Sequence, residues 1–277
     1  MSYTLSNLIQ DGVGELGRVA SRNIIATGGS TLTVIDTKLN LVGAPVYTDG
    51  DDSVVLGTML IVATTDGLAP QGEFSRISAY AESSTTFTVD TAFTAVVGAG
   101  DECLIIHSQF RLDELISMAN RALRDIGEMY KIDSSITTSG TKQYDLPVAA
   151  KGYRPARIDI YVDADTRSPI SAYDYVPSAA GSVGSIIFQY DPPTAKTLYI
   201  TYSQPHPRVS DFDDAIDEDI AVPLAKWSLV VQLYRWQNPD DRGQINAMNE
   251  ALRNYEMAKQ RYKMWKPSRI PKYFVSK

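Results

Sequence analysis

The sequence has a single cysteine and only two histidines among its 277 residues. One cysteine cannot form an intramolecular disulfide framework, so we expect a chain that is made and kept in a reducing cytosol. No segment reaches the roughly 18 consecutive apolar residues of a membrane-spanning helix, and no basic and apolar leader of signal-peptide length is found. Repeats of about 20–50 residues and low-complexity tracts are also missing, which excludes solenoids and linker arrays. We expect a globular protein without membrane contact.

Catalytic motifs are equally scarce. The sequence contains no Walker loop and no serine in a Gly-x-Ser-x-Gly turn. His107 and His206 have no cysteine or further histidine at metal-ligand spacing, and Cys103 lies in an apolar segment typical of a core residue. Paired carboxylates for glycoside cleavage stay open, because their separation is set only in three dimensions. We predict that the protein is not an enzyme and holds no cofactor and no metal ion.

Two patterns are similar to ligand-binding motifs. Gly12-Val-Gly-Glu-Leu-Gly17 matches the dinucleotide fingerprint, with Asp36 near the place of a ribose-binding acid. The fingerprint also needs a strand before it and a crossover helix after it, and the sequence shows neither; a glycine-bearing helix that lets another backbone come close is favoured. Six acidic residues between 211 and 219 could ligate Ca²⁺. Their spacing fits no calcium loop, so a solvated acidic turn before a helix is favoured.

The charge is unevenly distributed. The chain has 26 Lys/Arg and 33 Asp/Glu, a formal net charge of -7, which argues against a general nucleic-acid binder. Residues 242–277 nevertheless contain nine Lys/Arg and two Glu, and the part from Trp265 onward has two prolines that prevent a continuing helix.

This C-terminal segment, residues 265–277, has three interpretations: a nucleic-acid clamp, a disordered solubilising tail, or a docking arm that lies in a groove of a partner subunit. The docking arm is favoured, because aromatic anchors and steering cations alternate along it. The predicted partner-binding residues are Trp265, Lys266, Arg269, Ile270, Lys272, Tyr273 and Phe274.

Hydrophobic periodicity predicts the secondary structure. Apolar residues at helical spacing predict helices over 5–19, 110–130 and 220–265, the last one divided by a turn at Asn238. Short β-branched runs between glycines and acids predict strands over 31–35, 57–62, 74–80, 85–89 and 102–106. A second β region follows, with strands over 142–147, 157–162, 185–190 and 197–202 and one dry face.

The predicted fold class is α+β, with a helical core and an inserted small antiparallel β-barrel or sandwich. The helical core comprises residues 1–22 and 108–264 and carries the second β region at about 140–205. The inserted β domain comprises residues 23–107, and an extended C-terminal arm comprises residues 265–277. The helix after Pro223 has almost no polar face, so we expect it to be buried by its own fold or by a neighbouring subunit.

Three segments carry a resemblance to a known family. They are Leu112-Asp-Glu-Leu-Ile-Ser-Met-Ala-Asn-Arg-Ala-Leu-Arg-Asp-Ile-Gly127, Tyr144-Asp-Leu-Pro147 and Asp219-Ile-Ala-Val-Pro223. With them, the chain resembles the head-to-tail connector (adaptor) proteins of tailed bacteriophages, which sit under the portal ring at the neck. The inserted β domain is similar to small β domains of phage virion proteins.

The resemblance implies a structural virion protein that is assembled in the host cytoplasm and located in the neck. It implies a homo-oligomeric ring, usually a dodecamer, that contacts the portal protein and further neck or tail proteins. DNA would pass through the lumen without sequence-specific binding. The arm would extend to the portal, and Trp227, Val231 and Tyr234 would form the interface between ring neighbours.

Two alternatives from other classes remain open. A virion-associated tail or glycan-binding protein would use residues 23–107 on host polysaccharide, although the candidate residues Tyr47, Tyr80 and Asp90 are scattered along the sequence. A tail-completion or tail-tube protein would be a β-rich hexamer, and the helical hairpin of this chain disfavours it.

Overall fold

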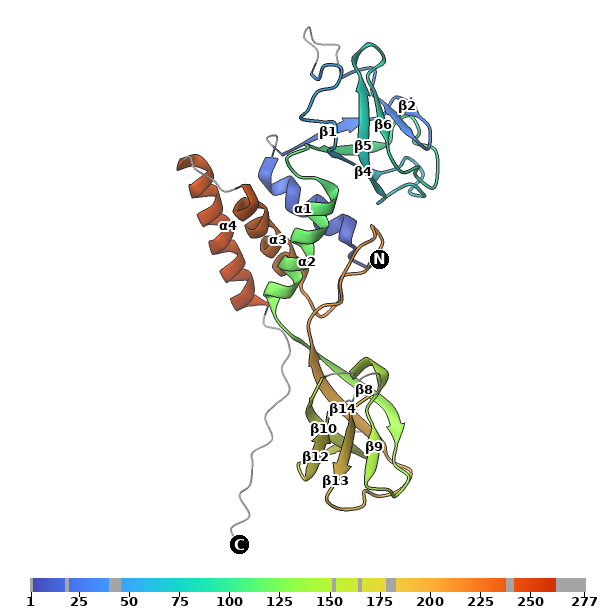
Figure 1. Ribbon diagram of the computed structural model, residues 1–277, viewed down its shortest axis with the longest axis vertical. Helices are drawn as coiled ribbons and strands as arrows, with labels where there is room; N and C mark the ends of the chain where they lie inside the picture. Colours follow the sequence, from blue (N-terminus) through green and yellow to red (C-terminus); the bar gives the residue numbers. More distant parts are fainter. Residues whose placement is uncertain are drawn as a thin grey trace. The chain divides into compact units, whose positions relative to one another are not determined.

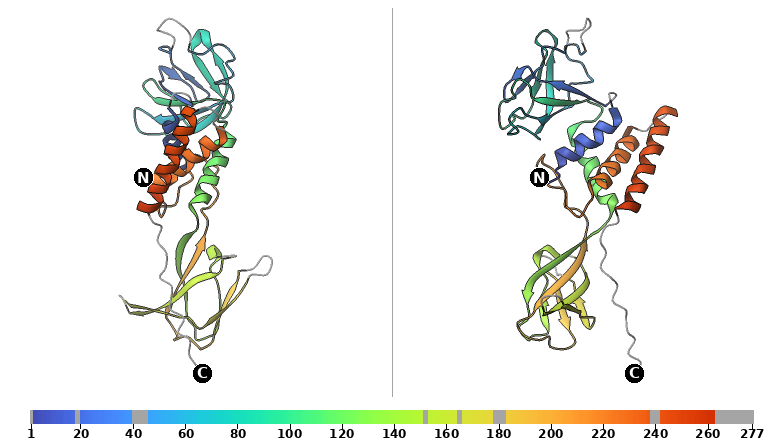
Figure 2. Two further views of the ribbon diagram at one scale, coloured as in Figure 1. Left: turned by 90° about the vertical axis from the view of Figure 1, so that its left-hand side faces the viewer. Right: turned by 180° about the vertical axis from the view of Figure 1, so that it is seen from behind.

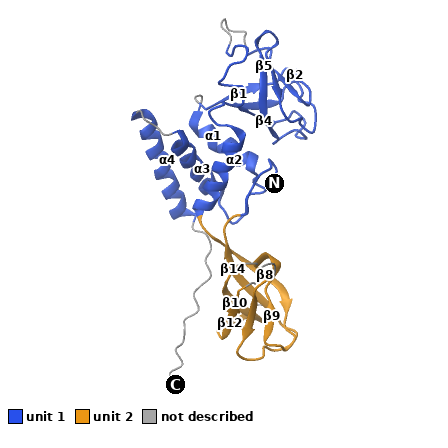
Figure 3. Ribbon diagram, in the orientation of Figure 1, with its two compact units in different colours: residues 1–126, 207–263 blue, residues 127–206, 264–277 orange. Residues whose placement is uncertain are grey.

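The structure is a computed structural model that describes residues 2–17, 20–39, 46–150, 153–163, 166–177, 183–237 and 242–262. The described residues form four α-helices and three antiparallel sheets, as Figure 1 shows. The predicted mixture of helices and antiparallel sheets is therefore confirmed. The chain divides into two compact units (Figure 3): unit 1 contains the described residues of 1–126 and 207–262, and unit 2 those of 127–206.

The first helix, α1 (Leu5–Leu16), begins at a capping box. The Thr4 side chain accepts a hydrogen bond from the Asn7 backbone, and the Asn7 side chain accepts one from the Thr4 N–H at 3.1 Å. Helix α2 (Leu112–Ile126) was predicted to continue to Tyr130, and this end was wrong. Gly127 adopts a φ of +111°, which is accessible to glycine, and the chain enters a strand at Met129.

The helix pair α3 (Val222–Gln237) and α4 (Arg242–Arg261) follows the second β region. Helix α3 packs against α1, α2 and α4, so its nearly continuous apolar surface is covered on several sides by its own subunit. In Figure 2 (right), α4 lies on the far side of α3 from α1. The expectation that α3 is buried is confirmed for seven of its residues, all of which its own subunit covers.

The first sheet belongs to unit 1 and has the strand order β1-β7-β4-β5-β6-β3-β2. Strands β1 and β2 occupy the two ends of this order, yet only Ala26 and Thr27 separate them in the chain. One short segment therefore pairs with β7 through its first half and with β3 through its second half. The strands are β1 (Ser21–Ile25), β2 (Gly28–Gly29), β3 (Thr33–Ile35), β4 (Thr58–Ala63), β5 (Phe74–Ala81), β6 (Thr86–Val89) and β7 (Glu102–Ile106), with the 3-10 turn η2 (Glu82–Ser84) between β5 and β6.

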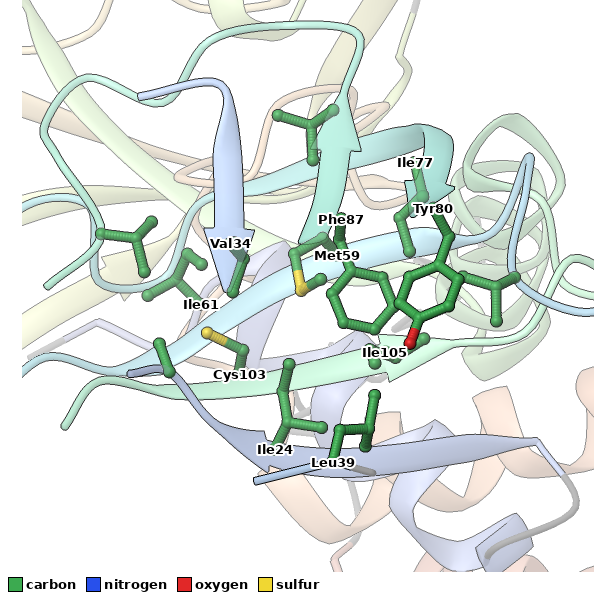
Figure 4. Packing of buried hydrophobic residues seen from close by; sticks show 14 of the residues in the cluster. Ile24, Val34, Leu39, Met59, Ile61, Ile77, Tyr80, Phe87, Cys103 and Ile105 are labelled. Atoms are coloured by element: carbon green, nitrogen blue, oxygen red, sulfur yellow. The ribbon is translucent and has the colours of Figure 1, made fainter. Parts of the chain in front are cut away.

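The core of this sheet is a single cluster of buried side chains (Figure 4). Phe87 is fully buried at its centre, between Met59 and Tyr80. The ring of Tyr47 meets those of Tyr80 and Phe87 edge-on, with centroids 5.8 Å and 6.2 Å away. Because α1 packs against β1 and β4, this core and the helices belong to one compact unit.

Unit 2 contains two smaller sheets with the orders β11-β10-β14-β8 and β12-β13-β9. Their buried faces form one cluster, to which Ile158, Leu198 and Phe188 contribute. On the other face of β14, Tyr199 is half-buried and lies under the Arg167 guanidinium, 3.8 Å from the ring centroid. The strands are β8 (Met129–Thr137), β9 (Gln143–Asp145), β10 (Pro155–Asp163), β11 (Thr166–Pro169), β12 (Tyr173–Val176), β13 (Ser185–Phe188) and β14 (Thr197–Gln204), with the 3-10 turn η3 (Val148–Ala150) after β9.

Candidate functional site

The predicted docking arm, residues 265–277, lies outside the described residues, and its seven partner-binding residues remain a prediction. The described chain ends at Tyr262, one residue after α4. The end of α4 borders a groove of about 530 Å³, which α3 and α4 form together. Met257 is 53% exposed on this groove, and the Lys226 ammonium lies 4.9 Å from the centroid of the Trp227 ring, which also lines it. The groove therefore presents apolar and cationic groups next to the start of the arm.

The three predicted ring-interface residues all lie on α3 and have different exposures. Trp227 and Tyr234 are half-buried, and both pack against the cluster between α3 and α4. Val231 is only 3% exposed and belongs to that cluster itself. Burial raises the pKa of the Tyr234 hydroxyl, with Glu15 and Glu250 as further causes. Trp227 and Tyr234 can still meet a neighbouring subunit, whereas Val231 contributes to the core of its own.

The outer surface of α4 carries a stripe of hydrogen-bond donors that the sequence interpretation did not single out. Positions four, seven, eleven and eighteen residues after Arg242 share one side of an α-helix with it. The residues of this donor stripe are Arg242, Asn246, Asn249, Arg253 and Gln260, and all five are exposed. Within the described chain, neither arginine forms an ion pair. Spacing alone could have revealed the stripe, but only the fold shows that it faces away from α3.

The acidic loop, residues 211–219, is hydrogen-bonded to the start of α1. The backbone N–H of Leu5 donates to the Asp214 carbonyl at 2.9 Å, and that of Ser6 donates to the Phe212 carbonyl at 3.2 Å. The Asp214 carboxylate accepts hydrogen bonds from the backbone N–H groups of Asp211 and Ser210, which lower its pKa. No acidic cluster suited to a metal ion occurs among the described residues, including this loop. The loop fits the solvated acidic turn that the sequence predicted.

Asn120 of α2 fixes the chain where it returns from the second β region. Its amide nitrogen donates to the carbonyls of Ile116 and Val209, at 2.8 Å each, and its amide oxygen accepts from the Val209 N–H at 2.9 Å. The side chain thus pairs with the Val209 backbone as a neighbouring strand would. Asn120 is the asparagine of the segment 112–127, and its role explains why that segment carries an amide among apolar residues.

The sites that resembled ligand motifs are structural in the described chain. Gly12 lies on α1 against Leu229 of α3, where a Cβ atom would come within 2.7 Å of Leu229 Cδ2. The close approach predicted for this helix thus involves a side chain. The Asp36 carboxylate is buried and accepts a hydrogen bond from the Lys38 backbone at 3.0 Å. Cys103 is 1% exposed in β7, and burial raises the pKa of its thiol to about 12.

The aromatic residues considered for glycan binding do not form an exposed platform. Tyr47 and Tyr80 are 5% and 4% exposed, inside the core of the first sheet. Asp90 lies on the surface, where it pairs with Arg76. The Tyr47 hydroxyl lies 3.2 Å from Nε2 of His107, and burial raises the pKa of this tyrosine to about 12. Tyr47 and Tyr80 therefore stabilise the fold and are not exposed to a ligand.

The groove, the donor stripe and the acidic loop are exposed features that lie outside the buried cores. The sequence matches the family of the SU10 adaptor protein over residues 79–271. The chain belongs to this family and is a structural adaptor protein of a bacteriophage. None of the curated proteins matches the chain. Among the described residues, no helix is long and apolar enough to cross a membrane.

Proposed function

We propose that this adaptor forms a ring under the portal of a tailed phage, extends the DNA channel and links the head to the tail. The observation that carries this proposal is the family match over 79–271, which includes α2, the second β region and the α3–α4 hairpin. The composition of residues 265–277, which combines aromatic and basic side chains, supports a docking arm. Assembly of the ring would take place in the host cytoplasm.

The charge distribution supports passage of DNA without binding. Residues 1–126 and 207–262 carry 14 Lys/Arg and 25 Asp/Glu. Residues 127–206 carry seven Lys/Arg and eight Asp/Glu. The last 15 residues carry five Lys/Arg and no acid. A ring built from such copies presents an acidic surface that repels the DNA backbone, while the cationic arms remain for a protein partner.

We further propose that the first sheet is closed into a small barrel. The supporting observation is the segment Ser21–Gly29, whose two halves pair with β7 and β3 at opposite ends of the strand order. Closure removes exposed strand edges, which suits a protein packed beside identical copies.

Binding to purified portal rings tests the docking arm. Full-length protein should add a ring of density to the portal in negative-stain electron microscopy, and truncation after Lys263 should abolish it. Truncation after Val275 removes only two residues and serves as the control that should still bind. Equal binding by both truncated forms would exclude a docking arm, and no binding by full-length protein would favour a tail or glycan-binding role.

The ring interface is tested at Trp227. Replacing this half-buried residue with Asp should prevent assembly on the portal, because an unpaired charge in an interface is strongly disfavoured. Trp236→Asp is the matched control, since Trp236 is 46% exposed at the other end of α3. Circular dichroism would separate unfolding from loss of assembly. A complete ring of folded Trp227→Asp subunits would place the interface elsewhere.

A further inference from the structure

Unit 1 presents two complementary surfaces on different sides of its helical layer. The donor stripe of α4 lies on the side of α3 away from α1, and the acidic loop is bonded to the start of α1 and lies near α2 (Figures 1 and 2). A surface that binds a different surface on an identical copy produces a head-to-tail contact, which closes into a ring when the rotation permits.

The chemistry of the donor stripe fits a carboxylate-rich surface. Arginine and amide side chains donate hydrogen bonds, and arginine binds carboxylates with two parallel bonds. The same side of the helix carries one carboxylate, Glu256, fourteen residues after Arg242. Glu256 is paired with Lys259 at 3.6 Å, so its charge is compensated within α4. Arg242 and Arg253 are 11 residues apart, which corresponds to about 16 Å along the helix.

The acidic loop supplies the complementary groups in a fixed geometry. Asp211, Asp213 and Glu218 are exposed, whereas Asp214 uses its carboxylate to hold the turn. The N–H of Ile216 donates to the Tyr3 carbonyl at 2.8 Å, and the ring of Phe212 meets that of Phe74 edge-on at 6.0 Å. A loop fixed in this way loses little conformational entropy when a partner binds.

We propose that the donor stripe of one copy binds the acidic loop of the next copy, and that this contact joins neighbours in the ring. The proposal rests on the ring stated above and specifies how its subunits recognise one another. It predicts a head-to-tail contact with a direction, because the two surfaces differ. An isologous contact between two α4 helices would instead bring arginines together.

Charge reversal tests the contact on the full-length chain. The stripe variant carries Arg242→Glu and Arg253→Glu, and the loop variant carries Asp211→Lys and Asp213→Lys. Each should reduce the number of copies assembled on portal rings at least about ten-fold, because like charges then face each other. Mixing the two variants, or combining all four substitutions in one chain, should restore assembly. Native mass spectrometry and electron microscopy give the copy number.

A matched control and the remaining outcomes distinguish the proposed contact from ring formation itself. Arg121→Glu with Arg124→Glu changes the net charge equally on exposed positions of α2, and should leave assembly unchanged. Normal rings from the stripe variant, or failure of the mixture to recover, would overturn the contact while leaving the ring intact. If the stripe variant failed to assemble while the loop variant assembled normally, the donor stripe would bind an acidic partner other than this loop. Absence of rings from the unmodified protein would reject the ring.

Discussion

The two β regions of this protein are built in different ways. The first sheet has one core centred on Phe87, contacts α1 and clusters with the helices as unit 1. The second region has two smaller sheets around its own core and forms unit 2. Residues 23–107 carry two Lys/Arg and ten Asp/Glu, whereas residues 127–206 are nearly balanced. The difference indicates that the first β region is a fixed, acidic part of the helical body and that the second folds around its own core.

Denaturation of two core variants should give the largest difference in stability between the two β regions. Phe87→Ala removes a fully buried ring from the first core, and should lower the free energy of unfolding of unit 1 by about 3–5 kcal/mol. Phe188→Ala, at 2% exposure, should destabilise only unit 2. Urea titrations followed by amide hydrogen exchange assign each transition to a unit. A single transition shifted equally by both variants would show that the two regions unfold together.

A pair of glycine variants on α1 tests the same comparison with a smaller expected change in the free energy of unfolding. Gly12→Ala places a Cβ atom 2.7 Å from Leu229 Cδ2, and overpacking of this kind costs about 1–3 kcal/mol. Gly14 has open space around its Cβ position, so Gly14→Ala should stabilise the helix by about 1 kcal/mol. Both changes should appear in the same thermal transition as Phe87→Ala. If the two changes appeared in a separate transition, the helices and the first sheet would unfold independently.

Alkaline titration tests two buried ionisable groups of the first core. Burial raises the pKa values of Cys103 and Tyr47 from 9.0 and 10.0 to about 12, so the folded state holds these protons more tightly than the unfolded chain. Their contribution to stability is complete below the unfolded values and is lost as the pH rises to about 12. Unit 1 should therefore lose stability between pH 9 and 12.

Tyr47→Phe should reduce this loss, as measured by chemical denaturation at several pH values. Tyr190→Phe is the control, since Tyr190 is 77% exposed in unit 2 and its removal should change nothing in unit 1. An unchanged pH dependence in Tyr47→Phe would mean that the pKa of its hydroxyl is the same in the folded and unfolded states.

All eight interior strands of the sheets could be predicted from the sequence, and five of the six edge strands could not. Strands β3 to β7, β10, β13 and β14 have two neighbours each, and their β-branched and aromatic residues reveal them. The strands that the sequence missed are β1, β2, β8, β11 and β12, and every one lies at the end of its sheet order. An edge strand buries less, so its residues need not alternate; β8, for example, contains Lys131, Asp133 and two serines.

The candidate surfaces were predictable only in part. The charge of the acidic loop and the stripe spacing on α4 are visible in the sequence, but the side of the helical layer on which each lies depends on tertiary packing. The burial of Val231 shows the same limit, because a helix apolar on every side does not reveal which side its own subunit covers.

The pairing of α1 with α3 has a consequence for how the protein is made. Glu15 and Lys226 form an ion pair at 2.7 Å although 211 positions separate them, so the helical layer cannot close before the ribosome has produced most of the chain. At translation rates of about 5–20 residues per second, α1 waits at least about ten seconds for its partner. All strands of the three sheets are synthesised before α3, so they can pair before the helical layer closes.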